Sequence, residues 1–133
     1  MANVIYPIYK KALLDGSSNI SLSGGTVKVA LIDTGTYTYN AAHDFLNDIS
    51  GIVGTAQTIG TVTTTGGLFD GDNVTFTAVS GNSVEALIIY IDTGSSATSR
   101  LVAYIDTGVT GLPVTPNGGD VGITWNASGI FQL

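Results

Sequence analysis

The tripeptide Asp-Thr-Gly, which occurs three times, is the first feature of this sequence that could carry out chemistry. The copies begin at Asp33, Asp92 and Asp106, and each follows an apolar run that ends in Ile. In aspartic proteases two such aspartates meet across a two-fold or pseudo-two-fold axis and share a proton. Here two of the three copies lie only 14 residues apart, and the apolar-apolar-Gly element that accompanies the protease motif has no convincing match.

The same tripeptide is well suited to ending a strand. An Asp carboxylate caps a turn, Thr suits a strand end, and Gly accepts a positive φ angle. We therefore interpret all three copies as strand-ending turns, with an aspartic-type hydrolase that requires Asp33 as the enzymatic alternative. The predicted turn residues are Asp33, Gly35, Asp92, Gly94, Asp106 and Gly108.

Nucleophilic catalysis would need a general base, and His43 is the only histidine. It precedes Asp44, and Asp48 follows one turn later, but the chain has no Gly-x-Ser-x-Gly element to present a serine nucleophile. Cysteine is absent, which excludes thiolate catalysis, disulfides and zinc–thiolate sites. We expect His43 to be exposed or to form structural hydrogen bonds, and we expect the protein not to be an enzyme.

Acidic side chains also cluster at Asp70 and Asp72. Such oxygen-rich clusters can hold Ca²⁺, but the EF-hand loop with its closing Glu is absent, and a tight turn explains the same residues. Glu85, the only glutamate, lies in an apolar run, and we expect it to face solvent or to pair with Lys28 or Arg100. We predict no metal and no cofactor, with a cation at Asp70 and Asp72 as the open alternative.

Composition restricts the partners of the protein. The 133 residues include 4 Lys and Arg against 10 Asp and Glu, a net charge of −6, and the charged fraction of 11% is under half of the usual value of about 25%. So few cations disfavour duplex nucleic acid and acidic membranes. The longest apolar run, Ala86 to Ile91, is far shorter than the roughly 20 residues that span a bilayer, and no signal peptide is readable. A surface of Thr, Ser, Gly and Asn indicates a protein that neighbours partly cover.

The hydrophobic pattern predicts an all-β fold with little helix. Helical spacing of apolar residues predicts a helix over 6–15, closed by Gly16, within an N-terminal helical segment 1–16. One or two helical turns are expected over 40–48, with Asn40 as N-cap. We predict one domain, 1–133, folded as an antiparallel β-sandwich or jelly roll. The expected strands are 26–33, 52–65, 73–79, 84–91, 101–105, 121–125 and 129–133, with 84–91 and 101–105 at the centre.

The segment 52–65 differs from the other expected strands. It is rich in Thr and Gly and has only a weak period of two, so we expect either one long strand or two strands here. A strand of this kind tolerates slippage of its register unless it is paired on both sides.

The order of these elements resembles small virion structural proteins of tailed bacteriophages and prophages. The likeness covers nearly the whole chain, and its motifs are structural rather than catalytic. It implies a β-rich virion component made in the bacterial cytoplasm. The segments that carry it, besides the N-terminal helix, are Val27 to Thr34, Tyr37 to Tyr39, His43 to Ile49, Phe69 to Thr77, Tyr90 to Gly94 and Trp125 to Phe131.

These observations favour a capsid decoration or cement subunit that binds other virion proteins, the major capsid protein first among them, as a homo-oligomer. A tail, neck or fibre-associated subunit is the alternative, and edge-strand pairing would serve there equally well. A third hypothesis is a carbohydrate-binding β-domain displayed on the particle, with Tyr37, Tyr39 or Trp125 as stacking platforms. The candidate contact residues are Tyr6, Tyr9, Tyr37 and Tyr39.

Overall fold

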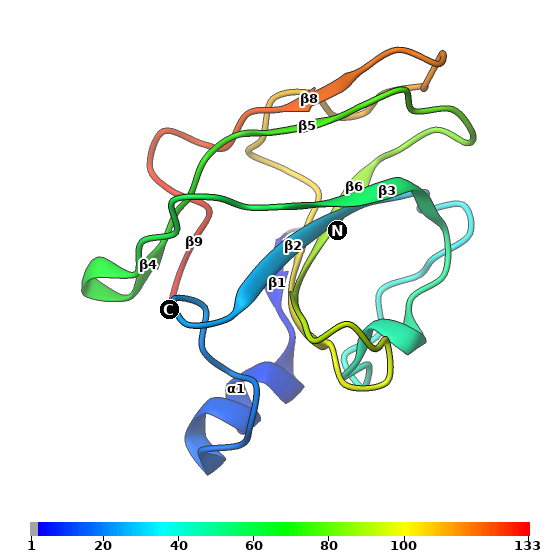
Figure 1. Cartoon of the computed structure of the whole chain (residues 1–133). Helices are drawn as coiled ribbons and strands as arrows, with labels where there is room; N and C mark the ends of the chain where they lie inside the picture. The colour runs from blue at the N-terminus through cyan, green and yellow to red at the C-terminus, as the bar shows by residue number, and fades with distance from the viewer. Residues whose placement is uncertain (1–2) are drawn as a thin grey trace.

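A five-stranded antiparallel sheet is the largest element of the computed structural model, which describes residues 3–133. Its strand order is β1-β7-β6-β2-β3, so the strands predicted to be central, now β6 and β7, lie inside it (Figure 1). Residues 1 and 2 of the predicted domain and N-terminal segment lie outside the described residues. The strands of this sheet are β1 Val4–Ile5, β2 Thr26–Ile32, β3 Ile52–Thr58, β6 Ala86–Asp92 and β7 Arg100–Ile105.

Two small antiparallel sheets complete the fold. They pair β4 with β9 and β5 with β8, and their buried side chains share one core with the large sheet. The predicted antiparallel all-β fold is therefore confirmed, and the layer that packs on the large sheet consists of two short pairs. The strands are β4 Leu68–Phe69, β5 Val74–Phe76, β8 Val121–Ile123 and β9 Phe131–Gln132.

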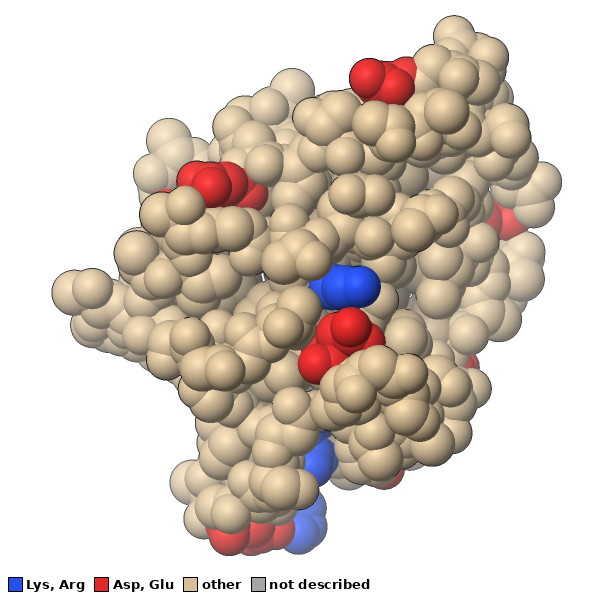
Figure 2. Space-filling model, in the orientation of Figure 1, with Lys and Arg blue, Asp and Glu red and all other residues tan. Residues whose placement is uncertain are grey.

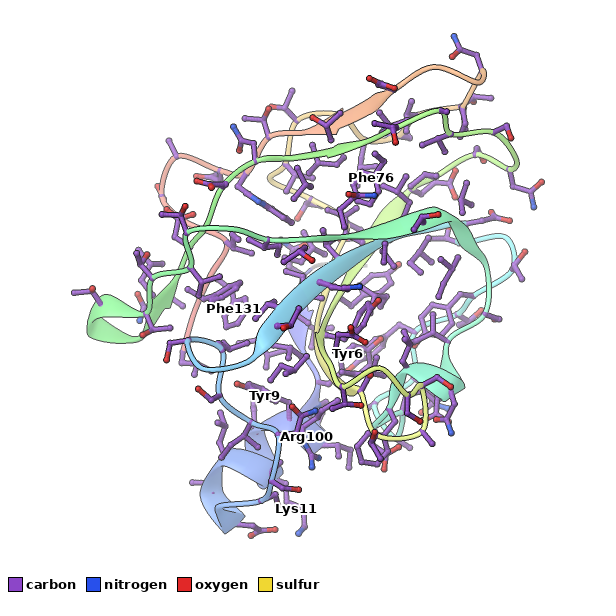
Figure 3. The ribbon with its side chains drawn as sticks, in the orientation of Figure 1. Tyr6, Tyr9, Lys11, Phe76, Arg100 and Phe131 are labelled. Carbon is purple, nitrogen blue, oxygen red and sulfur yellow. The ribbon has the colours of Figure 1, made fainter. Side chains whose placement is uncertain are left out.

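The apolar central strands are buried on both faces, as their continuous hydrophobic runs require. Every residue of β7 is buried, and in β6 only Asp92 is partly accessible. Side chains alternate between the two faces, so Tyr104 and its cross-strand partner Ile88 face one way while Ile89 faces the other. Figure 3 accordingly shows Tyr6 and Phe76 on opposite sides of the large sheet. None of the helices within residues 3–133 is long and apolar enough to cross a membrane.

The predicted N-terminal helix is confirmed as α1, Pro7–Asp15, which ends at Gly16 in the left-handed conformation. It projects from the sheets (Figure 1), and only Tyr9 and Ala12 of its side chains are buried. Just before it, the Tyr6 N–H donates to the Val102 carbonyl at 2.9 Å, which ties the helix to β7.

The helical turns expected over 40–48 reduce to a single 3-10 helix, η1 Leu46–Asp48. Asn40 accepts a hydrogen bond from the Ala42 N–H at 2.9 Å, so it caps a turn and not a helix. The backbone that follows is used elsewhere: the Leu46 N–H donates to Ser99, and the Asp44 carbonyl accepts from the Leu101 N–H. Bonding to the start of β7 therefore replaces bonding within a helix.

Four predicted strands are clearly shorter in the structure: the strand expected over 121–125 is reduced to β8 and that over 129–133 to β9, and 52–65 and 73–79 also end early. The 52–65 strand ends at Thr58 and the 73–79 strand at Phe76, because Thr61 and Ala78 adopt φ angles of 50° that interrupt an extended chain. A second 3-10 helix, η2 Thr65–Gly67, leads into β4.

Candidate functional site

Asp33 is held in a dense set of hydrogen bonds from its own chain. One carboxylate oxygen accepts from the Gly35 N–H at 2.9 Å, and the other accepts from Thr36 Oγ1 at 2.9 Å and from the Asn82 amide at 3.0 Å. These bonds, that of Thr36 first, hold the pKa of Asp33 below its usual value. The carboxylate thus closes the turn after β2, as the sequence predicted.

The second and third copies end their strands by related means. The Gly94 N–H donates to Asp92 at 3.1 Å, and this bond leads the interactions that lower the pKa of Asp92. After β7 an asparagine from the N-terminal segment takes the role of acceptor, since Asn3 Oδ1 accepts from the Asp106 N–H at 2.7 Å and from the Thr107 N–H at 3.0 Å. Gly94 and Gly108 have positive φ angles.

Gly35 does not have the positive φ angle that the turn interpretation predicted. Its φ angle is not positive, but a Cβ atom at this position would lie 3.1 Å from the Asp33 carboxylate oxygen. The three aspartates also do not converge. Because β2 and β6 are antiparallel, Asp33 and Asp92 lie at opposite ends of the sheet, and β6 separates Asp33 from Asp106.

The structure gathers three of the four predicted contact tyrosines into one cluster with Tyr104. The Tyr6 and Tyr39 rings lie 5.2 Å apart, and the Tyr39 and Tyr104 rings 5.6 Å apart. Tyr37 completes the cluster at 6.5 Å from Tyr104. Because Tyr104 comes from β7, the cluster fastens the chain after β2 and the segment before α1 to the centre of the sheet.

A relay of hydrogen bonds runs through this cluster to the single histidine. The hydroxyls of Tyr6 and Tyr37 are 2.9 Å apart, and the Tyr37 hydroxyl is 2.8 Å from His43 Nδ1. With His43 neutral, all three groups are satisfied when Tyr6 donates to Tyr37 and Tyr37 donates to Nδ1. Burial and the bond to Tyr37 raise the pKa of Tyr6. His43 therefore has the structural hydrogen bond that the sequence predicted.

The expected contact surface of Tyr6, Tyr9 and Tyr37 is not available on the chain. All three side chains are buried, and Tyr9 lies apart from the cluster, where its hydroxyl donates to the Ile20 carbonyl at 2.9 Å. Burial raises the pKa of Tyr9 to about 12. Tyr37 and Tyr39 were predicted to share in a contact patch, but both rings pack against Tyr104 of β7, and only Tyr39 remains partly accessible.

Tyr39 borders a hollow of about 300 Å³. A second hollow of about 460 Å³ shares Thr34 and Tyr104 with the first. Tyrosine rings and threonine hydroxyls line the first hollow, whereas Glu85, Asp106 and Thr107 line the second. Tyr104 belongs to the expected central strand 101–105, and no sequence pattern singles it out as a residue that lines a hollow. The full lining is Thr34, Tyr37, Thr38, Tyr39, Glu85, Tyr104, Asp106, Thr107 and Pro113.

Glu85 does not pair with either cation that the sequence suggested. Its Oε1 accepts from both the N–H and the hydroxyl of Thr34 at 3.0 Å. Lys28 is instead 3.4 Å from Asp92. The Arg100 guanidinium donates to the carbonyls of residues 18 and 19, and it lies 5.1 Å from the centre of the Phe45 ring.

The acidic cluster after β4 lies in the link to β5, where no turn is formed, and its carboxylates are bonded within the chain. Asp70 accepts from the Gly71 N–H at 2.9 Å, and Asp72 accepts from Thr61 Oγ1 at 2.8 Å. The Trp125 indole donates to the Asp72 carbonyl at 2.8 Å, and the Trp125 side chain is buried rather than presented as a platform. Within residues 3–133 no group of three His, Asp or Glu side chains could hold a metal ion.

The surface itself carries few charges. Figure 2 shows wide areas of uncharged residues with isolated acidic and basic groups among them. No protein-family model matches this chain, and no curated protein sequence matches it.

Replacing Tyr37 by Phe tests the hydrogen-bond relay. The change removes the hydroxyl that both Tyr6 and His43 contact, and it leaves a buried Tyr6 hydroxyl without its partner. We expect the free energy of unfolding to fall by about 1–3 kcal/mol in urea titrations. Tyr39→Phe is the matched control: its hydroxyl has no hydrogen bond to residues 3–133, so a change within about 0.5 kcal/mol is expected. Equal effects of the two substitutions would contradict the relay.

The turn aspartates predict how stability depends on pH. The pKa values of Asp33 and Asp92 are lowered in the folded chain, whereas in the unfolded chain they are about 3.9. Their stabilising effect is present above the unfolded value and is lost as the pH falls through the folded values. We expect Tm to decrease from pH 5 to pH 2, and to decrease less in Asp33→Asn, whose amide oxygen can still accept from Gly35. An unchanged pH dependence in that variant would show that Asp33 contributes none of it.

Proposed function

We propose that this protein is a structural subunit of a phage virion, and specifically a decoration or cement subunit that stabilises the head shell by protein–protein contacts. The observation that carries the proposal is the largely uncharged surface of an all-β protein (Figure 2). The resemblance of its segments to small virion proteins supports the same function.

A surface of this kind suits permanent contact with neighbours. The centre of a protein interface is depleted in charged residues, because each charge removed from water must be compensated. Here several of the few acidic groups are already bonded within the chain: Asp33 by its turn, Glu85 by Thr34 and Asp92 by Lys28. Covering the remaining hydroxyl, amide and backbone groups therefore has a low electrostatic cost.

The partners follow from the same surface. The major capsid protein is the first candidate, contacted by several copies of this chain arranged with the symmetry of the shell. The net charge of −6 makes the packaged nucleic acid an unsuitable direct partner. A subunit of the tail, neck or fibre would use equivalent contacts at a different place on the particle.

Purified particles test this function directly. We expect the protein in particles at hundreds of copies, and we expect particles stripped of it to release their nucleic acid at a lower temperature, measured by dye fluorescence during heating. Adding the purified protein back should restore the original temperature. A ring of about six or twelve copies would place the subunit in the tail or neck instead. Absence from particles would exclude both locations.

The tyrosine-lined hollow favours a second candidate function, the binding of neutral carbohydrate on the particle surface. Tyr39 is the partly accessible ring at this hollow, and the hydroxyls of Thr34 and Thr38 lie beside it. Aromatic rings offer an apolar face to the C–H side of a sugar, while hydroxyls and carboxylates bind its O–H groups. Glu85, in the adjoining hollow, is the carboxylate placed to do so.

A glycan array tests this candidate. We expect neutral glycans bound by the wild-type protein to be lost on Tyr39→Ala, because the accessible ring is removed. Thr77→Ala, at an exposed position on the β5 side of the fold, is the matched control and should leave binding unchanged. An array without any bound glycan would discard this candidate, and it would not affect the structural function.

A further inference from the structure

The helix α1 presents an exposed side that projects away from the sheets (Figure 1). Pro7, Lys10, Lys11 and Leu14 are exposed and follow one another at intervals of three, one and three residues, so they lie along one side of the helix. Leu14 is 89% exposed, more than any other large apolar side chain of residues 3–133. Helices dock into grooves of a partner through side chains at this spacing. We refer to these four residues as the α1 outer face.

Lys10 differs from the other cations of the chain in having no partner. Within residues 3–133 it forms no hydrogen bond and no ion pair. Its ammonium group is therefore available to a carboxylate of another molecule. The other three cations each have a partner in their own chain: Lys11 has Asp15, Lys28 has Asp92, and Arg100 has the carbonyls of residues 18 and 19.

Positive and negative side chains are divided between the two ends of the large sheet. The four Lys and Arg belong to α1 or lie near the starts of β2 and β7, and the bonds from Arg100 to residues 18 and 19 place α1 at that same end. At the opposite end Asp33 follows β2, Glu85 precedes β6 and Asp106 follows β7, with no Lys or Arg among them. Two copies that met through their acidic ends would repel each other, whereas an acidic end is complementary to α1 of another copy.

The acidic end also carries the two adjoining hollows, which share Thr34 and Tyr104. Glu85 lines the hollow of about 460 Å³, and its bonds to Thr34 leave its negative charge in place. Burial, and then the negative charges of Asp106 and Glu85, raise the pKa of Tyr104. Tyr39 lines the hollow of about 300 Å³. One hollow is therefore acidic and its neighbour is aromatic.

We propose that the α1 outer face of one copy docks in the two hollows of a second copy, with Lys10 against Glu85 and Leu14 against Tyr39. Lys10 and Leu14 are one helical turn apart, about 6 Å along the axis, so a single turn reaches both adjoining hollows. A lysine beside a carboxylate and the Tyr104 ring gains an ion pair and a cation–π contact. Covering Leu14 with the Tyr39 ring removes apolar surface of both from water.

This contact is head-to-tail, because α1 and the hollows lie at opposite ends of the same chain. Repeated from copy to copy, it closes into a ring or continues as a filament. A ring suits a subunit that follows the symmetry of a shell, and the inference rests on the proposed function only for that location. Carbohydrate, the occupant in the second candidate function, would compete for the same hollows.

Sedimentation equilibrium of the purified full-length protein tests the contact from the side of α1. We expect the wild-type chain to associate, with a dissociation constant weakened on the order of 10-fold by Lys10→Gln and on the order of 100-fold by Lys10→Glu, which places two carboxylates together. Lys28→Gln is the matched control: it removes the same charge at the same end of the sheet but not from α1, and it should leave association unchanged.

The side of the hollows is tested in the same way. Glu85→Gln removes the charge while its amide oxygen still accepts from Thr34, and it should weaken association on the order of 10-fold. Asp120→Asn, which likewise keeps an acceptor for its backbone partner, the Ala78 N–H, is the control outside the hollows and should have no effect. Circular dichroism and Tm confirm that each variant is folded.

Mixing two defective variants distinguishes a head-to-tail contact from a two-fold one. Lys10→Glu has an intact acidic end, and Thr107→Trp, which obstructs the acidic hollow, has an intact helix. Each alone should be monomeric, and their mixture should form heterodimers and nothing larger, because only one helix and one hollow can still combine. A monomeric wild-type protein, association that Lys10→Glu leaves unchanged, or a mixture without heterodimers would each overturn the inference. Particle occupancy is scored separately: an oligomer absent from particles removes the proposed function alone, and a monomer bound to particles removes this contact alone.

Discussion

Burial of β6 and β7 on both faces is the constraint on which the rest of the structure depends. Their side chains are apolar in unbroken runs, so neither face of the sheet can be left to water. On the face of Ile89 the cover includes the β5–β8 pair with Phe76. On the face of Ile88 and Tyr104 the cover is the chain after β2 together with the segment before α1, and the hydrogen bonds of Tyr6, Tyr37 and His43 fix that chain in place.

The same constraint determines where the charges lie. A fully apolar strand can carry a polar group only where it ends, and the aspartates at the ends of β2 and β6 bind the backbone amide of the glycine two residues later. Their carboxylates are thereby occupied by the turns that they close. What faces outward between these turns is mainly Thr, Ser, Gly and Asn, so the scarcity of charge on the surface follows from how the strands are built and ended.

Patterns within one segment were sufficient to predict the central strands, the N-terminal helix and the turns that Asp33 and Asp92 close. Predictions that depended on distant partners were not. The sequence over 40–48 is typical of helical turns. The backbone of Asp44 and Leu46 instead forms hydrogen bonds to β7 and to the loop before it, and no local sequence pattern reveals these distant partners. Tyr6 and Tyr37 were candidate contact residues, but both are buried, and a buried hydroxyl needs a partner. Each supplies that partner to the other, and the sequence separation of 31 residues hides the pair.

The alignment of β3 against β2 is the feature that the sequence of β3 specifies least. Its weak alternation gives the core few side chains to select one alignment against β2, and the pairing shifts between Val29 and Leu31, where Gly54 with φ 70° follows Val53. β5 lies along the outer side of β3, where the Val79 side chain lies close to Gly54. Packing against this neighbour, together with the ladder to β2, therefore holds an alignment that the side chains of β3 select only weakly.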